Sequence, residues 1–257
     1  MTCRAAFKSV IINQFMGNAI TSGMRWLGRS SIFSAPRRYA GKFLNDYYLN
    51  KNKFYAIYDP PGAAQAFALI RQIKAETEML LTELEAFQIY TAVVKTGKLE
   101  GDIAEVGVYK GGSAKLICET TDKPVHLFDT FEGLPEISEN DNPKEFGKGD
   151  YAASLESVQQ YLKPYPNAHF YKGLFPATAG PIQNQRFSFV HLDVDIYEST
   201  LACLQYLHPR ITGGGVIISH DYQKSAGVKN AFDSFFRDKP EIVIELAGCS
   251  QCLVVKV

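Results

Sequence analysis

From residue 103 to the end of the chain, short apolar stretches alternate with stretches of helical periodicity. A strand followed by a helical crossover and another strand builds a parallel sheet, and the crossovers cover both of its faces. This alternation predicts an α/β, Rossmann-like domain. The expected strands are 103–108, 125–128, 169–171, 187–192, 216–219, 242–246 and 253–257.

The last two of these strands are joined only by residues 247–252, which is too short for a helical crossover. The final strand is therefore expected to run antiparallel in an otherwise parallel, seven-stranded sheet. Ahead of the sheet, apolar residues recur at helical spacing from Leu80 through Leu84 and Phe87. They predict a long amphipathic helix that ends near Val94.

The charge balance and the cysteines limit the possible partners and compartment. The 27 basic and 27 acidic residues cancel, so the chain has no global field that would gather nucleic acid. A small-molecule partner is expected instead. Five cysteines, an odd number, favour a reducing, cytoplasmic location over a disulfide framework. No apolar run reaches the roughly 18 residues that a transmembrane helix needs.

The beginning of the chain is basic, because seven Lys and Arg residues precede the first acid, Asp46. Such a segment is compatible with a transit peptide, a membrane-surface helix or a helical arm that packs on its own domain or a second subunit. We favour the arm. Residues 1–75 are thus expected to form a helical extension that acts as a lid or in homo-oligomerisation, and residues 76–257 the catalytic domain.

A glycine-rich turn follows the first expected strand and contains Glu105, Gly107, Gly111 and Ser113. Glycines let a backbone approach a ligand closely, and the following helix N-terminus offers free amides. Asp129 ends the next strand, where an acid can accept hydrogen bonds from ribose hydroxyls. The spacing fits neither a Walker motif nor the dinucleotide fingerprint, which favours another nucleoside cofactor. Glu105 suits a cationic amino-acid moiety, although it could merely cap the next helix.

A second group of polar residues follows two later strands. Asp193 and Asp195 come after 187–192, and His220 and Asp221 come after 216–219. The carboxyl ends of parallel strands share one edge of a sheet, so these side chains are expected to converge there. Oxygen-rich clusters of this kind hold Mg²⁺ or a similar hard cation. The alternative is that the acids only cap the helices that follow.

From about Met79 to Val257 the chain resembles the macrocin O-methyltransferase-like family, whose members are class I, metal-dependent enzymes that methylate sugar hydroxyls of macrolide and aminocoumarin antibiotics. The matching motifs are 105–113, 128–135, 172–176, 192–200 and 213–215. The resemblance implies that Asp193 and Asp221 bind Mg²⁺ and that Asp195 is the general base. It also implies that S-adenosylmethionine is surrounded by Gly107, Gly111, Ser113, Asp129, Gly133 and Gly173.

The chain departs from the family at His220-Asp221-Tyr222, where the family usually carries Asp-Asp-Tyr. Imidazole is a poorer ligand for Mg²⁺ and a better one for Mn²⁺, Fe²⁺ or Zn²⁺. We therefore expect a divalent metal on Asp193, His220 and Asp221, and methyl transfer from S-adenosylmethionine to a hydroxyl of a natural-product sugar or a catechol-like diol. The alternatives are a catalytically silent S-adenosylmethionine-binding relative and a nucleotide-sugar epimerase or reductase.

Overall fold

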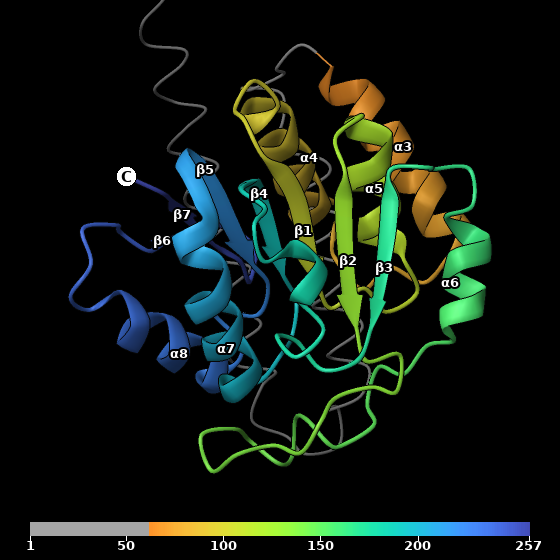
Figure 1. Cartoon of the computed structure of the whole chain (residues 1–257). Coiled ribbons are helices and arrows are strands. Elements are labelled where there is room, and N and C mark those ends of the chain that lie inside the picture. Colours follow the sequence, from red (N-terminus) through yellow and green to blue (C-terminus); the bar gives the residue numbers. More distant parts are fainter. Residues whose placement is uncertain (1–61) are drawn as a thin grey trace, which may run out of the picture. The chain divides into compact units, whose positions relative to one another are not determined.

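The expected strands form one seven-stranded sheet in the order β3-β2-β1-β4-β5-β7-β6 (Figure 1). β1 to β5 pair in parallel, whereas β7 is antiparallel to β5 and to β6. The predicted fold is therefore confirmed. The strands are β1 Asp102–Val106, β2 Val125–Asp129, β3 Ala168–Lys172, β4 Phe187–Leu192, β5 Ile211–Ser219, β6 Ile244–Glu245 and β7 Cys252–Val255.

The structure is a computed structural model that describes residues 62–257. The predictions made for the basic start of the chain, including an arm that joins two subunits, fall mostly on residues 1–61 and lie outside the described residues. The helix at 63–76, which the sequence analysis assigned to that extension, packs within the same unit as the sheet and contacts the helices at 83–96 and 112–120.

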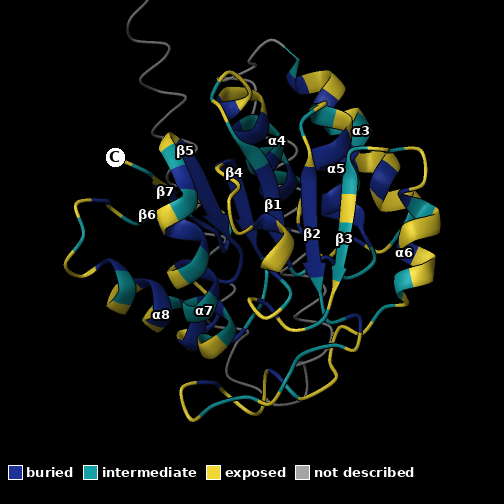
Figure 2. Cartoon of the chain, viewed as in Figure 1, coloured by how far each residue is buried: buried dark blue, intermediate teal, exposed yellow. Residues whose placement is uncertain are grey.

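The helices cover both faces of the sheet and enclose two hydrophobic cores. Successive strand residues point to opposite faces, so Ile103 contributes to one core and Ala104 to the other. The strands are accordingly buried along nearly their whole length in the middle of the sheet (Figure 2). On the Ile103 face lie α3 Ala63–Glu76, α4 Glu83–Thr96, α5 Gly112–Thr120 and α6 Leu155–Tyr161, and on the other face α7 Tyr197–Leu207 and α8 Ala226–Phe236.

α4 begins three residues later than the apolar spacing predicted. Thr82 caps the helix: its hydroxyl accepts the amide of Glu85, and the Glu85 carboxylate accepts the amide of Thr82. This reciprocal capping box satisfies two amides that the first turn leaves free. Leu80 precedes the cap and is 55% exposed, so its apolar side chain does not belong to the buried face of the helix.

The long loop between β2 and α6 passes beneath the carboxyl ends of the strands (Figure 1). Its buried Asp141 fixes it to the other side of that edge, because Oδ1 accepts the amide of Tyr197 at the start of α7. The other oxygen accepts the amide and the hydroxyl of Ser138 within the loop. A Cβ at Gly227 of α8 would lie 2.0 Å from Asp141 Oδ1, so the close approach requires glycine there.

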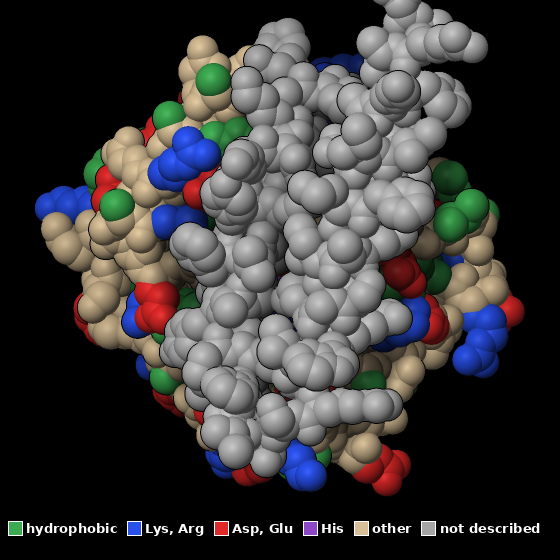
Figure 3. Space-filling view, turned by 180° about the vertical axis from the view of Figure 1, so that it is seen from behind, with side chains coloured by type: hydrophobic (Ala, Val, Ile, Leu, Met, Phe, Trp, Pro, Cys, Tyr) green, Lys and Arg blue, Asp and Glu red, His purple; other side chains and the backbone are tan. Residues whose placement is uncertain are grey.

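Among the described residues that Figure 3 shows from behind, acidic and basic side chains are interspersed at the margins of the view. This agrees with the overall charge balance of the chain. Within residues 62–257, none of the helices is long and apolar enough to cross a membrane.

Candidate active site

A cavity of about 520 Å³ opens at the carboxyl ends of β1, β2, β4 and β5. This is the edge where open parallel sheets bind their ligands. Most of the residues singled out in the sequence line this one cavity, and they lie at the carboxyl ends of five strands, β1 to β5, or in the segments that follow them. They are Gly107, Ser113, Asp129, Gly133, Gly173, Asp193, Asp195, His220 and Asp221.

Glu105 is not among the residues that line the cavity. Strand alternation points its side chain to the α4 and α5 face of the sheet, where it is fully buried and Oε1 lies 2.8 Å from Nδ1 of His191 on β4. Burial raises the pKa of Glu105 even though His191 opposes that shift. The structure therefore places Glu105 beneath the glycine-rich turn, where it supports the neighbouring strand rather than facing a ligand.

Gly111 also lies away from the cavity. It adopts a left-handed conformation (φ +79°) immediately before α5, and a Cβ there would come within 3.1 Å of the Val158 side chain on α6. Its glycine is required by the turn and by the packing of α6. The sequence motif is thus present as expected, but this member contributes to it for a structural reason.

The glycines that do line the cavity are constrained by the protein itself. At Gly107 (φ +89°) a Cβ would lie 1.8 Å from the carbonyl oxygen of Asp193, and at Gly133 (φ +85°) 2.4 Å from the backbone of Gly149. At Gly173 the nearest atom would be the Thr178 methyl group, at 2.8 Å. Close contact with another backbone therefore accounts for Gly107 and Gly133, and close contact with the Thr178 side chain accounts for Gly173, without reference to a ligand.

Asp129 organises the glycine-rich turn from the end of β2. Oδ2 accepts the amides of Val108 at 2.7 Å and Tyr109 at 2.9 Å, while Oδ1 accepts the amide of Phe131 at 2.7 Å. The Thr130 hydroxyl also donates to Oδ1, at 3.5 Å, which is the longest of the four bonds and the one most readily exchanged for a ligand donor. Asp129 both shapes the turn and lines the cavity that the turn encloses.

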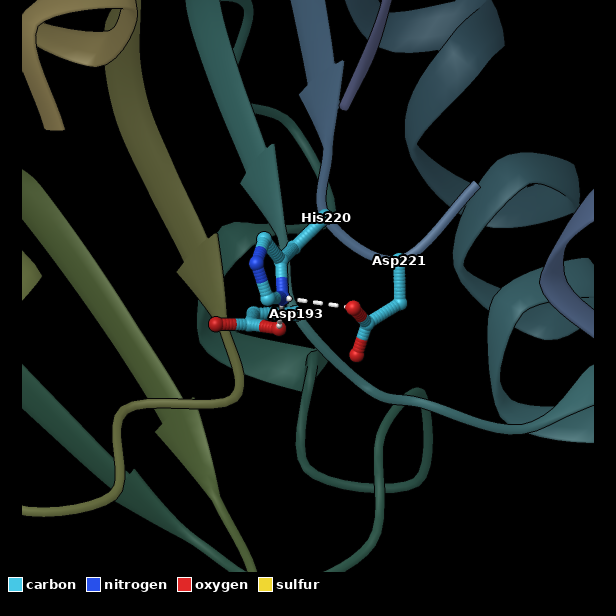
Figure 4. A group of neighbouring side chains, drawn as sticks. All are labelled: Asp193, His220 and Asp221. Atoms are coloured by element: carbon cyan, nitrogen blue, oxygen red, sulfur yellow. Dashed lines mark ion pairs between the residues drawn. The ribbon is translucent and has the colours of Figure 1, made fainter. Parts of the chain in front are cut away.

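The ends of β4 and β5 bring Asp193, His220 and Asp221 together, as the sequence predicted (Figure 4). Nδ1 of His220 lies 3.0 Å from Oδ1 of Asp193 and 3.3 Å from Oδ1 of Asp221. The imidazole is 8% exposed and Asp221 is 9% exposed. Two carboxylates and one imidazole nitrogen therefore converge on one point at the floor of the cavity.

Asp195 completes this acidic group and has an unusual backbone. Asp195 (φ +61°) and Asp221 (φ +56°) both adopt the left-handed conformation, which costs a residue with a side chain about 1–2 kcal/mol. The hydroxyl of Ser225 donates to the carbonyl of Asp195 at 2.9 Å and holds that turn. Strain retained at two neighbouring acids is typical of functional sites.

The protonation of the acids differs with their surroundings. Burial raises the pKa of Asp195 well above its usual range, and the charge of Asp193 and a hydrogen bond with Asp221 act in the same direction. Burial also acts to raise the pKa of Asp221, but hydrogen bonding and charge from His220 prevail and lower it.

The cluster fits the divalent metal that the family resemblance implies. Two carboxylates and an imidazole are a donor set that binds divalent cations, and the imidazole suits Mn²⁺, Fe²⁺ or Zn²⁺ better than Mg²⁺. Each of the three residues can offer one ligand atom, and these atoms all lie within 4.8 Å of one another. The acids crowded around Asp195 also favour a cation in electrostatic terms.

The opposite wall of the cavity carries large apolar side chains that were not singled out from the sequence. It includes residues of the β2–α6 loop and of the segment after β3, and three of its large apolar side chains are exposed: Leu80, Tyr151 and Leu174, at 55%, 41% and 51%. Tyr109 packs edge-on against Tyr151 across this opening. Apolar residues scattered through loops give no periodic signal, so only the fold assembles them.

A sheet of this order, with the glycine-rich turn and the acids at one edge, is a Rossmann-like fold. The solved O-methyltransferase NovP superposes with a TM-score of 0.62 at 23% identity, covering 70% of this chain and 83% of that one. At this identity the likeness concerns the fold.

The chain belongs to the macrocin O-methyltransferase family, because the family model described as Macrocin-O-methyltransferase (TylF) matches residues 73–252. A tetracenomycin-C 4'-O-methyltransferase from Streptomyces olivaceus is 30% identical over 164 residues, which are 58% of this chain and 63% of that protein. A demethyldecarbamoylnovobiocin O-methyltransferase from Streptomyces niveus is 28% identical over 188 residues, 67% of this chain and 71% of that protein. The chain thus spans somewhat less than two thirds of the first relative.

Proposed function

We propose that this chain is an S-adenosylmethionine-dependent O-methyltransferase that methylates a hydroxyl of a small molecule, with a divalent metal on Asp193, His220 and Asp221. The observation that carries the proposal is the meeting of two groups in one cavity: the turn ordered by Asp129 and the acids at the ends of β4 and β5. The family to which the chain belongs supports the same reaction.

The acceptor is proposed to be a sugar hydroxyl of a natural product, or a diol such as a catechol. Three relatives are O-methyltransferases named for a rhamnosyl-tetracenomycin-C, for demethyldecarbamoylnovobiocin and for mycinamicin III. The exposed apolar residues at the cavity mouth, Leu80, Tyr151 and Leu174, suit an acceptor whose hydroxyls are carried on a largely apolar body. Two vicinal hydroxyls suit the open positions of a metal held by three protein ligands.

S-adenosylmethionine supplies the methyl group, and the metal would lower the pKa of an acceptor hydroxyl bound to it. The chain itself must hold the acceptor oxygen in line with the methyl group and remove its proton. Asp195, which lies beside Asp221, would take this proton, and its raised pKa would let it hold the proton. Asp129 and the turn it orders orient the cofactor.

The long β2–α6 loop would exclude water from this cavity. It contributes Leu134, Phe146 and Tyr151 to the wall, and Asp141 ties it to the start of α7, two residues beyond Asp195. The hydrogen bond between Asp141 and the Tyr197 amide thus anchors the loop close in sequence to the proposed base.

We also propose a cytoplasmic location, since the four cysteines within residues 62–257 are free.

The direct test measures S-adenosylhomocysteine formed from sugar and catechol acceptors with added Mg²⁺ or Mn²⁺. Asp195→Asn is expected to lower turnover by about 10²–10⁴ and to leave metal and cofactor affinity near the wild-type values. Asp193→Asn is expected to weaken metal binding and to be partly rescued by excess metal. Glu136→Gln, an exposed change in the loop, is the matched control and should behave as wild type.

Full activity in the presence of a chelator would remove the metal from the proposal and make His220 the leading candidate for the base. S-adenosylmethionine binding without turnover on any acceptor, with or without metal, would favour a catalytically silent relative instead. Binding of NADH in a fluorescence titration would point to an epimerase or reductase.

A further inference from the structure

Metal binding through Nδ1 does not explain the surroundings of the other ring nitrogen of His220, Nε2, which faces away from Asp193 and Asp221. Nε2 of His220 is buried and makes no hydrogen bond within the described residues. Oε1 of Glu85, from the first turn of α4, lies 3.5 Å from it. Glu85 is 2% exposed, so this is a carboxylate buried against a ring nitrogen that lacks a partner.

We propose that Glu85 is a positioning residue for the metal site. Its carboxylate accepts a hydrogen bond from Nε2–H of His220, so that the ring presents an unprotonated Nδ1 to a cation held with Asp193 and Asp221. The proposal rests on the metal-assisted function proposed above. It adds a residue from a separate helix to the site and gives His220 a defined orientation and tautomer.

Glu85 is held rigidly enough for this role. Oε2 accepts both the amide and the hydroxyl of Thr82, each at 2.8 Å. Oε1 accepts the amide of Ser250 at 2.9 Å and its hydroxyl at 2.7 Å. All four of these hydrogen bonds are donated to the carboxylate, two to each oxygen, as suits the ionised form. A fixed anion therefore stands behind the imidazole.

A charged carboxylate behind a metal-bound imidazole has two chemical effects. It selects the tautomer in which the inner nitrogen carries a lone pair, and it makes that nitrogen a stronger donor. Both effects favour metals that bind nitrogen well, such as Mn²⁺, over Mg²⁺. Glu85 would then allow the chain to use histidine as a metal ligand beside Asp193 and Asp221.

The simpler alternative is that Glu85 only caps α4 and joins it to Ser250. The test is a titration of the full-length protein with Mn²⁺ and with Mg²⁺, comparing wild type with Glu85→Gln. Removal of such an outer partner typically weakens metal binding about 10–100-fold. We expect a loss of this size for Mn²⁺, a smaller loss for Mg²⁺, and a weaker ¹⁴N signal from the imidazole in the electron spin echo spectrum of bound Mn²⁺.

Glu83→Gln is the matched control. Glu83 lies in the same turn of α4, and its replacement by Gln removes one negative charge, as Glu85→Gln does. Its carboxylate pairs with Arg71 at the surface instead of facing His220. Glu83→Gln should therefore bind Mn²⁺ as wild type does. A cycle with His220→Asp gives a second check, since Glu85→Gln should have little further effect once the imidazole is gone.

Mn²⁺ affinity of folded Glu85→Gln within about twofold of wild type would overturn the proposal. If that variant does not fold, nitrogen NMR of the wild-type protein with bound Zn²⁺ decides: a hydrogen on Nε2 supports the proposal, and a hydrogen on Nδ1 overturns it. Failure of the wild type to bind any divalent metal also overturns it, while methylation that persists in chelator leaves the methyltransferase function standing.

Discussion

The sharpest test of the cavity's construction is Gly107→Ala. The left-handed backbone at this residue costs alanine about 1–2 kcal/mol. The new Cβ would also lie 1.8 Å from the carbonyl oxygen of Asp193. A rotamer change can move neither the Cβ nor the carbonyl oxygen, because both are fixed by the backbone. The ends of β1 and β4 must therefore separate, which weakens the 2.9 Å hydrogen bond from the Asp193 amide to Val106 by about 0.5–1.5 kcal/mol.

Together these two effects predict that Gly107→Ala lowers the free energy of unfolding by about 1.5–3.5 kcal/mol. Gly149→Ala separates them, because Gly149 has a similar φ of +86° but nothing within 4 Å of the added Cβ. It should lose only the backbone share, about 1–2 kcal/mol. Gly180→Ala has neither a positive φ nor a close neighbour and should be nearly neutral.

Equilibrium urea unfolding of the three variants gives the comparison, provided that the slope of the free energy of unfolding against urea concentration is the same in all three. Calorimetry with S-adenosylmethionine and with Mn²⁺ should show both affinities falling in Gly107→Ala, since the displaced segment leads into Asp193 and Asp195. If Gly107→Ala is as stable as Gly149→Ala and binds both ligands normally, the contact with Asp193 does not constrain this residue and the reasoning fails.

Asp129→Ala should weaken S-adenosylmethionine binding by about 1–3 kcal/mol, since it removes a charged acceptor and frees the amides of Val108 and Tyr109; unchanged calorimetric affinity would contradict this. Glu241 concerns acid stability instead. Burial acts to raise its pKa, but the hydrogen bond from Lys256 outweighs that and lowers the pKa to about 2 from 4.5. A lowered carboxyl pKa stabilises the fold above the unfolded value, and this stability is lost as the pH falls from 4.5 toward 2. In Glu241→Gln, the free energy of unfolding in urea should therefore fall less steeply between pH 4.5 and pH 2 than in the wild type. The same pH dependence in both proteins would show that other groups control acid stability.

Much of the fold was determined by local patterns in the sequence. The alternation of apolar runs with helical stretches predicted the parallel sheet, and acids directly after those runs predicted the cluster at its edge. These predictions succeed because strand direction alone brings Asp129, Asp193 and Asp221 to the same side. The sequence did not indicate that β7 lies between β5 and β6, since pairing between strands depends on contacts distant in the chain.

The partners of the predicted residues were decided only by the tertiary structure. Thr82 and Glu85 have the spacing of a capping box, which indicates a helix start and nothing more. The packing of α4 on the sheet brings Glu85 to His220, and the parity of β1 turns Glu105 toward His191 instead of the cavity. Chain order and spacing specify which residues can reach the edge of the sheet, whereas long-range packing fixes what each side chain faces there.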